Sequence, residues 1–124
     1  MNKNTILRVM WEFTLGIPID YDDENTKENQ NFKNAVFEIT EEISKITDGL
    51  TYNYCFGTWK KNPTENPIER DLSVRISIIV LQDNADVVYN IAKHIISKVN
   101  AKYDLGISHV QAMKTYGHSK HFIV

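Results

Sequence analysis

Apolar and polar residues alternate along three stretches of the chain, a period of two residues that is typical of β-strands with one buried face. These stretches are residues 5–14, 72–81 and 107–116. The middle one is the most regular, with an apolar face made of Leu72, Val74, Ile76, Ile78 and Val80. Arg75 lies on its other face. We expect that face to point to solvent, because an unpaired buried guanidinium is very costly.

Two further stretches carry apolar residues at steps of three and four, which is the spacing of one face of an α-helix. In residues 31–47 they are Phe32, Val36, Ile39, Ile43 and Ile46. After the candidate N-caps Asp83 and Asn84 they are Val88, Ile91, Ile95, Val99 and Tyr103. Gly49 follows the first helix and can close it in the left-handed conformation, and the helical spacing of the second runs up to Gly106. The aromatic run from Tyr52 to Trp59 predicts a fourth strand.

The predicted order is strand, helix, strand, strand, helix, strand, which is that of a split βαβ or ferredoxin-like sandwich. We therefore predict a single α+β domain over residues 1–124, with an antiparallel sheet, both helices on one face and the other face open. Its central strands are residues 5–14 and 72–81. The apolar tip Phe122-Ile123-Val124 predicts either a fifth edge strand or a segment that docks on a partner subunit.

Three short motifs resemble a known pattern. They are Asp48-Gly49-Leu50-Thr51, Gly57-x-Trp59 and Arg70-Asp71-x-Ser73 at the entry to an aliphatic strand. Together, over residues 32–103, they are similar to DUF3574, a small bacterial domain family of unknown function. The resemblance implies a ferredoxin-like fold and no mechanism, since no catalytic residue is established for that family. Asp71 stands where the family usually has glutamate, and the tail beyond Tyr116 is additional.

Length, charge and cysteine content narrow the function only slightly. The chain of 124 residues has a net charge of −2, so no overall field attracts nucleic acid or anionic membranes, and we expect neither as a partner. The single cysteine, Cys55, predicts a packed side chain in a reducing compartment. No apolar run reaches the ~20 residues needed to span a bilayer. Because Arg8 and Glu12 interrupt the N-terminal apolar run, no signal peptide is expected, and we predict a cytoplasmic protein.

Polar residues from several strands should share the open face. They are Arg8 and Glu12 from the first strand, Arg75 and Ser77 from the third, and His109 and Gln111 from the fourth, beside either Asn53 or the Tyr52/Tyr54 pair. Two arginines on adjacent central strands could together hold one anionic group. With a tyrosine or Trp59 stacking on a ring, the candidate binding set is Arg8, Glu12, Tyr54, Trp59, Arg75, Ser77, His109 and Gln111. The sequence thus predicts a non-catalytic domain that binds an anionic, nucleotide-like ligand.

Several alternatives remain open at this stage. The open face could simply be exposed to solvent, with Glu12 forming ion pairs with the arginines. It could also form a homodimer or bind a host protein in a bacterial or phage setting. Glu12 and His109 on neighbouring strands could form the acid/base pair of a small enzyme. The aromatic strand resembles an RNA-stacking platform, but the basic and aromatic signature of RNA readers is missing. No spacing predicts a metal site or a cofactor, because His118 and His121 have no third ligand beside them.

Overall fold

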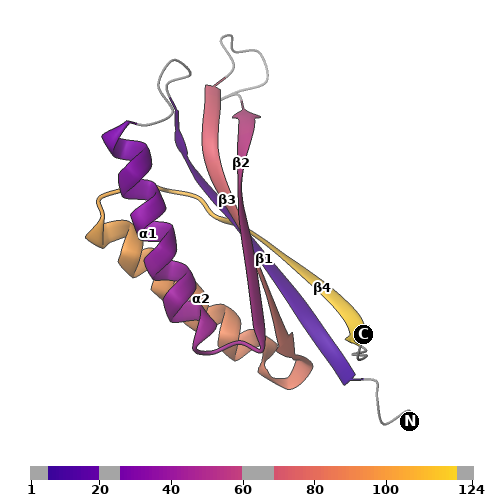
Figure 1. The fold of residues 1–124 in the computed structure, drawn as a ribbon. Helices are drawn as coiled ribbons and strands as arrows, with labels where there is room; N and C mark the ends of the chain where they lie inside the picture. Colours follow the sequence, from indigo (N-terminus) through magenta and orange to yellow (C-terminus); the bar gives the residue numbers. More distant parts are fainter. Residues whose placement is uncertain (1–5, 20–25, 60–68, 120–124) are drawn as a thin grey trace, which may run out of the picture.

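The structure is a computed structural model that describes residues 6–19, 26–59 and 69–119. Within these ranges the chain follows the order strand, helix, strand, strand, helix, strand (Figure 1). The elements are β1 (Ile6–Pro18), α1 (Lys27–Ser44), β2 (Gly49–Trp59), β3 (Glu69–Leu81), the short 3-10 helix η1 (Gln82–Asn84), α2 (Ala85–Lys102) and β4 (Gln111–Ser119).

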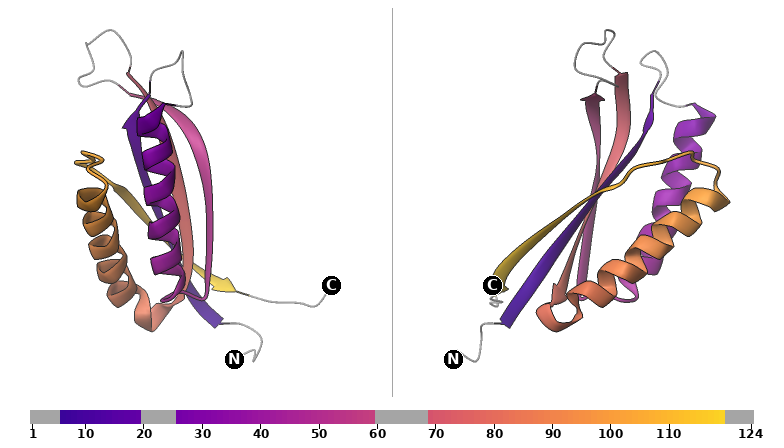
Figure 2. Two further views of the ribbon diagram at one scale, coloured as in Figure 1. Left: turned by 60° about the vertical axis from the view of Figure 1, so that its left-hand side comes forward. Right: turned by 180° about the vertical axis from the view of Figure 1, so that it is seen from behind.

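The strands form one antiparallel sheet in the order β2-β3-β1-β4, and both helices lie against the same face of it (Figures 1 and 2). The ferredoxin-like α+β prediction is therefore confirmed, with β1 and β3 as the central strands. The fifth strand predicted from the apolar tail would fall on residues 120–124, which lie outside the described residues. Neither of the two described helices combines the length and hydropathy needed to cross a membrane.

Several boundaries differ from the sequence prediction, and three of them have a clear local reason. β1 continues to Pro18, past the expected end at Thr14, because the chain still pairs with β3 there. α1 begins at Lys27, before its apolar period starts, since the Thr26 hydroxyl accepts a hydrogen bond from the backbone N–H of Asn29 at 3.2 Å and caps the helix. β4 begins at Gln111, so the predicted strand residues 107–110 form an irregular connection.

The core lies between the sheet and the helices, where the predicted inner face of β3 is at most 4% exposed. One polar contact ties β1 to α2: the Trp11 indole donates a hydrogen bond to the carbonyl of Ala85 at 3.0 Å, and its ring stacks on Tyr89 with 4.5 Å between centroids. The expectation that Ile91 faces the core is wrong. Ile91 is 40% exposed because α2 turns Ala92 and Ile96 inward in its place.

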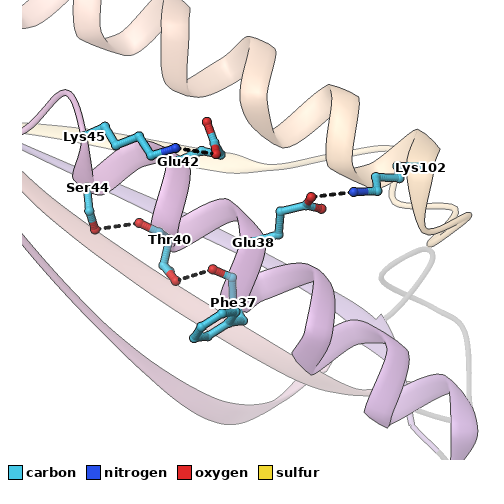
Figure 3. Close-up of polar contacts among 7 residues, drawn as sticks. All are labelled: Phe37, Glu38, Thr40, Glu42, Ser44, Lys45 and Lys102. Atoms are coloured by element: carbon cyan, nitrogen blue, oxygen red, sulfur yellow. Dashed lines mark hydrogen bonds and ion pairs between the residues drawn. The ribbon is translucent and has the colours of Figure 1, made fainter.

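The two helices also contact each other through polar side chains (Figure 3). The Lys102 ammonium on α2 forms an ion pair with the Glu38 carboxylate on α1, with 2.5 Å between nitrogen and oxygen. At the end of α1, Lys45 donates to the Glu42 carboxylate at 2.9 Å. The latter contact lowers the pKa of Glu42 below its ordinary value of 4.5. These contacts stabilise the helix layer and lie away from the open face of the sheet.

Candidate functional site

The register of the central strands separates the two arginines that the sequence placed together. Arg8 on β1 is opposite Leu81 of β3, whereas Arg75 is opposite Thr14. Arg75 and Leu81 are six positions apart along β3, so the two arginines lie about 20 Å apart along the strands at ~3.3 Å per residue. The prediction that they grip one anion is therefore wrong, although both lie on the open face as expected.

Arg75 instead belongs to a small polar cluster at the centre of the open face. Its Nε lies 3.5 Å from Oε1 of Glu12, and the Ser77 hydroxyl donates to Oε2 of the same carboxylate at 3.4 Å. The Arg75 side chain is 50% exposed and that of Glu12 is 27% exposed. Asn53, directly opposite Arg75 on β2, completes this polar area. Three predicted site residues, Glu12, Arg75 and Ser77, are thus brought together.

Tyr54 is not on the open face. The pairing of β2 with β3 places it opposite Val74, on the helix side, where its ring meets the edge of Phe32 at a centroid distance of 6.3 Å. Burial raises the pKa of the Tyr54 hydroxyl above its usual 10.0, with a smaller contribution from Tyr52. The prediction that it stacks on an open-face ligand is wrong, since residues of one strand alternate between faces. The side chain of Trp59 lies outside the described residues.

A hollow of about 490 Å³ opens at one end of the sheet, and we call it the sheet-end hollow. It exists because the paired lengths of the strands differ. The pairing of β1 with β4 ends at Thr14 and Gln111, whereas the pairing of β1 with β3 continues to Pro18 and Asp71. The last four residues of β1 therefore have no β4 residue opposite them. The segment 106–110, which runs from the helix layer to the sheet, lines the hollow there (Figure 2).

Polar side chains from three segments line this hollow. They are Thr14 on β1, Asp71 and Ser73 on β3, and Ser108, His109 and Gln111 before and at the start of β4. Leu15 and Ile107 add apolar surface. Arg75 is next to the hollow, because it is directly opposite Thr14 and two residues from Ser73 on the same face.

His109 and Gln111 thus lie together at the hollow, but away from Glu12. The residue opposite Glu12 on β4 is Met113, and His109 lies four positions earlier, which is about 13 Å of extended chain. The His109 ring is exposed, and its Nδ1 lies 3.0 Å from the Ser108 hydroxyl. The structure therefore does not assemble the acid/base pair of Glu12 and His109 that the enzyme alternative requires.

Sequence reasoning missed Thr14, Gly16 and Ser73 as parts of the site. Gly16 allows β1 and β3 to approach closely here: a Cβ at this position would overlap the Ser73 hydroxyl and would lie 2.9 Å from the Leu72 carbonyl oxygen. The Gly16-x-Pro18 sequence is typical of the start of a loop. Only the continued pairing with β3 shows that it is strand.

Metal binding has no support in the part of the chain that the structure describes, where no group of three histidine, cysteine or acidic residues could hold an ion. The only cysteine, Cys55, is partly buried on β2 opposite Ser73 and forms no disulfide.

These features define a small ferredoxin-like α+β protein with polar groups gathered at one end of its sheet. No protein-family model matches the chain, and no curated protein matches its sequence. Its resemblance to DUF3574 therefore stays a prediction.

Solved structures share its fold at low sequence identity. A phage SAM lyase in complex with S-methyl-5′-thioadenosine is 10% identical, with a TM-score of 0.53 over 92% of this chain and 90% of the lyase. The de novo designed protein Foldit4 is 15% identical, with a TM-score of 0.50 over 87% of this chain and 96% of the design. A putative PII-like signalling protein from Thermus thermophilus is 14% identical, with a TM-score of 0.45 over 94% and 93% of the two chains. Likeness at these identities shows the fold alone.

Proposed function

We propose that this protein binds a small, nucleoside-like ligand with an anionic group in the sheet-end hollow, without catalysing a reaction. The observation that carries the proposal is the hollow itself, where hydroxyl, amide and imidazole groups of three segments converge around about 490 Å³. That volume lies within the range of small-molecule sites, roughly 300–1,000 Å³. A binding module needs only such a shaped, polar concavity, whereas an enzyme also needs a positioned acid, base or nucleophile.

The lining suits a ligand with a flat apolar ring and polar substituents. Leu15 and Ile107 offer apolar surface to a ring. The Gln111 amide both donates and accepts hydrogen bonds, and the Thr14 hydroxyl does the same, so sugar hydroxyls would find partners. Arg75, half exposed beside Thr14, is the group that would contact an anionic substituent, in competition with its present partner Glu12.

One structural neighbour supports nucleosides as the first ligands to test. The phage SAM lyase was solved with S-methyl-5′-thioadenosine, a nucleoside, and its chain superposes on most of this one. Because the two sequences are only 10% identical, the neighbour suggests a ligand class and assigns no residue.

The experiment is a calorimetric titration of adenosine and adenosine 5′-monophosphate into the wild type, Gln111→Ala and Arg75→Met. We expect Gln111→Ala to weaken both ligands, and Arg75→Met to weaken only the phosphorylated one, by about ten- to a hundred-fold per lost charge-assisted hydrogen bond. Thr51→Ala is the matched control, since Thr51 is exposed on the same face but lies on β2, outside the hollow. Unchanged binding in both site variants would place the ligand elsewhere, and no binding by the wild type would refute the proposal.

A second candidate function, protein interaction, is favoured by the edge strand β2. Its eleven residues carry no charge and no proline, and Tyr52 and Phe56 are 41% and 58% exposed. Charged residues and prolines on an edge strand hinder pairing with another strand, so an exposed edge strand without them readily pairs. We therefore propose that the protein works in the cytoplasm as a homodimer, or that it captures a host protein through this edge.

Light scattering of the full chain at tens of micromolar tests the homodimer. The wild type should have the mass of a dimer. Thr51→Lys, which places a charge on the β2 edge strand, should have the mass of a monomer. A monomeric wild type would contradict self-association and leave only a different protein as the partner of this edge.

A further inference from the structure

A second hollow, of about 280 Å³, lies on the open face far from the sheet-end hollow, and we call it the Arg8 hollow. Arg8 and Met10 on β1, Ile79 on β3, and Thr115 and Gly117 on β4 contribute to its lining. It lies near the start of β1, where Arg8 is paired with Leu81 on one side and Gly117 on the other. Arg8 and Thr14, which lines the sheet-end hollow, are six positions apart along β1, which is about 20 Å.

The Arg8 side chain is well covered, and one of its guanidinium donors has no hydrogen-bond partner in the described part of the chain. The side chain is only 15% exposed, and this donor, Nε, is buried. Among the described residues, the acidic group that Arg8 meets is Oδ2 of Asp48, 3.9 Å away and therefore beyond the 2.7–3.2 Å of a hydrogen bond. Asp48 is itself 56% exposed and stays hydrated. An arginine cannot lose its charge to avoid this desolvation.

The structure leaves room beside this side chain. Gly117 is directly opposite Arg8, and a Cβ built on Gly117 would meet nothing within 4 Å. The next open-face residue of β4, Thr115, adds a hydroxyl to the lining. The hollow therefore combines an under-bonded cation, a hydroxyl donor and empty space, and at about 280 Å³ it suits a group smaller than a nucleoside.

We propose that the Arg8 hollow binds a small oxyanion, a phosphate or a carboxylate, next to the Arg8 guanidinium, whose charge Asp48 meets only at 3.9 Å. Charge-assisted contacts from a guanidinium to such oxygens are short and stronger than neutral ones. This site is separate from the sheet-end hollow, and its test does not depend on the function proposed above.

NMR of the backbone amide and arginine Nε–H resonances of the full chain tests where the anion binds. Titration with inorganic phosphate should shift the Arg8 Nε–H and Gly117 N–H resonances and leave Thr14 and Gln111 unmoved. A parallel titration with acetate shows whether the site prefers a phosphate or a carboxylate. If neither ion shifts the Arg8 and Gly117 resonances at tens of millimolar, or if both ions shift every strand alike, the proposal is wrong.

Arg8→Met should weaken the preferred anion by about ten- to a hundred-fold, because it removes the cation and keeps much of the side-chain volume. Lys98→Met removes an exposed cation of α2, outside both hollows, and is the matched control, for which affinity should not change. Should Arg8→Met fail to fold, Gly117→Val decides the question, since valine suits a strand and would fill the hollow. Undiminished affinity in folded Arg8→Met or in Gly117→Val would overturn the proposal.

Discussion

Gly16→Ala is expected to destabilise the protein, although alanine usually improves on glycine in a strand. The added Cβ would overlap the Ser73 hydroxyl and lie 2.9 Å from the Leu72 carbonyl oxygen, a backbone atom that moves only if the β1–β3 pairing moves. Adding atoms to such a place costs about 1–3 kcal/mol. The loss of unfolded-chain freedom returns about 0.4–1 kcal/mol.

The net loss is then about 1–2 kcal/mol, which for a chain of this length lowers Tm by about 4–8 °C. Calorimetry of the full chain measures it. Gly57→Ala is the matched control, because a Cβ there would meet nothing within 4 Å and should leave stability unchanged or slightly raised. Ser73→Gly should rescue Gly16→Ala in part, by removing the hydroxyl but not the Leu72 carbonyl. If Gly16→Ala is as stable as Gly57→Ala, the close strand approach that forms one side of the sheet-end hollow does not exist.

Three further changes test the core, the tie between sheet and helices, and the helix layer. Ile76→Asp should lower the free energy of unfolding by at least about 4 kcal/mol in urea, because it buries a charge on the inner face of the sheet. Asn53→Asp, on the open face, should change it by no more than about 0.5 kcal/mol. Equal stabilities would contradict the assignment of these residues to opposite faces. Trp11→Phe should cost about 1–3 kcal/mol, as it removes the indole hydrogen bond to the carbonyl of Ala85 and part of a buried ring, and an unchanged urea midpoint would contradict this. Lys45 lowers the pKa of Glu42, so this pair stabilises the fold above pH 4.5, and the contribution is lost as pH falls through the lowered pKa. The stability of the wild type relative to Glu42→Gln should therefore decrease from pH 7 to pH 2. A difference that stays constant over this range would refute the pairing.

The alternation of residues predicted which side chains share a face, and for β3 this was enough. Val74 and Ile76 are buried and Arg75 is exposed, as their period of two requires. The same reasoning could not decide Tyr54 against Asn53, because β2 is aromatic or polar at nearly every position and its pattern favours neither face. Only its register with β3, with Asn53 opposite Arg75, settles the choice.

Alternation says nothing about how far along a shared face two residues lie, and this is where the predicted site failed. β1 and β3 are each thirteen residues long, so the open face extends for about 40 Å along them. Arg8 and Arg75 share that face, but Arg8 lies at one end of the β1–β3 pairing and Arg75 lies six positions away, near its middle. Register depends on where each strand begins and ends, and Gly16 and Pro18 suggested a loop although Leu15 and Ile17 continue the inward face of β1.

Strand length explains why polar groups gather at one end of the sheet. β4 has nine residues and β1 has thirteen, so the last stretch of chain before β4 must cover the end of β1 without pairing with it as a strand. That segment carries His109 and Ser108, whose side chains are free of the two-residue alternation that a strand would impose. One side of the sheet-end hollow is therefore a rigid pair of central strands, and the other is an irregular connection. Changes at the exposed Ser108 and His109 should therefore cost little stability, whereas Ile107 packs against the core.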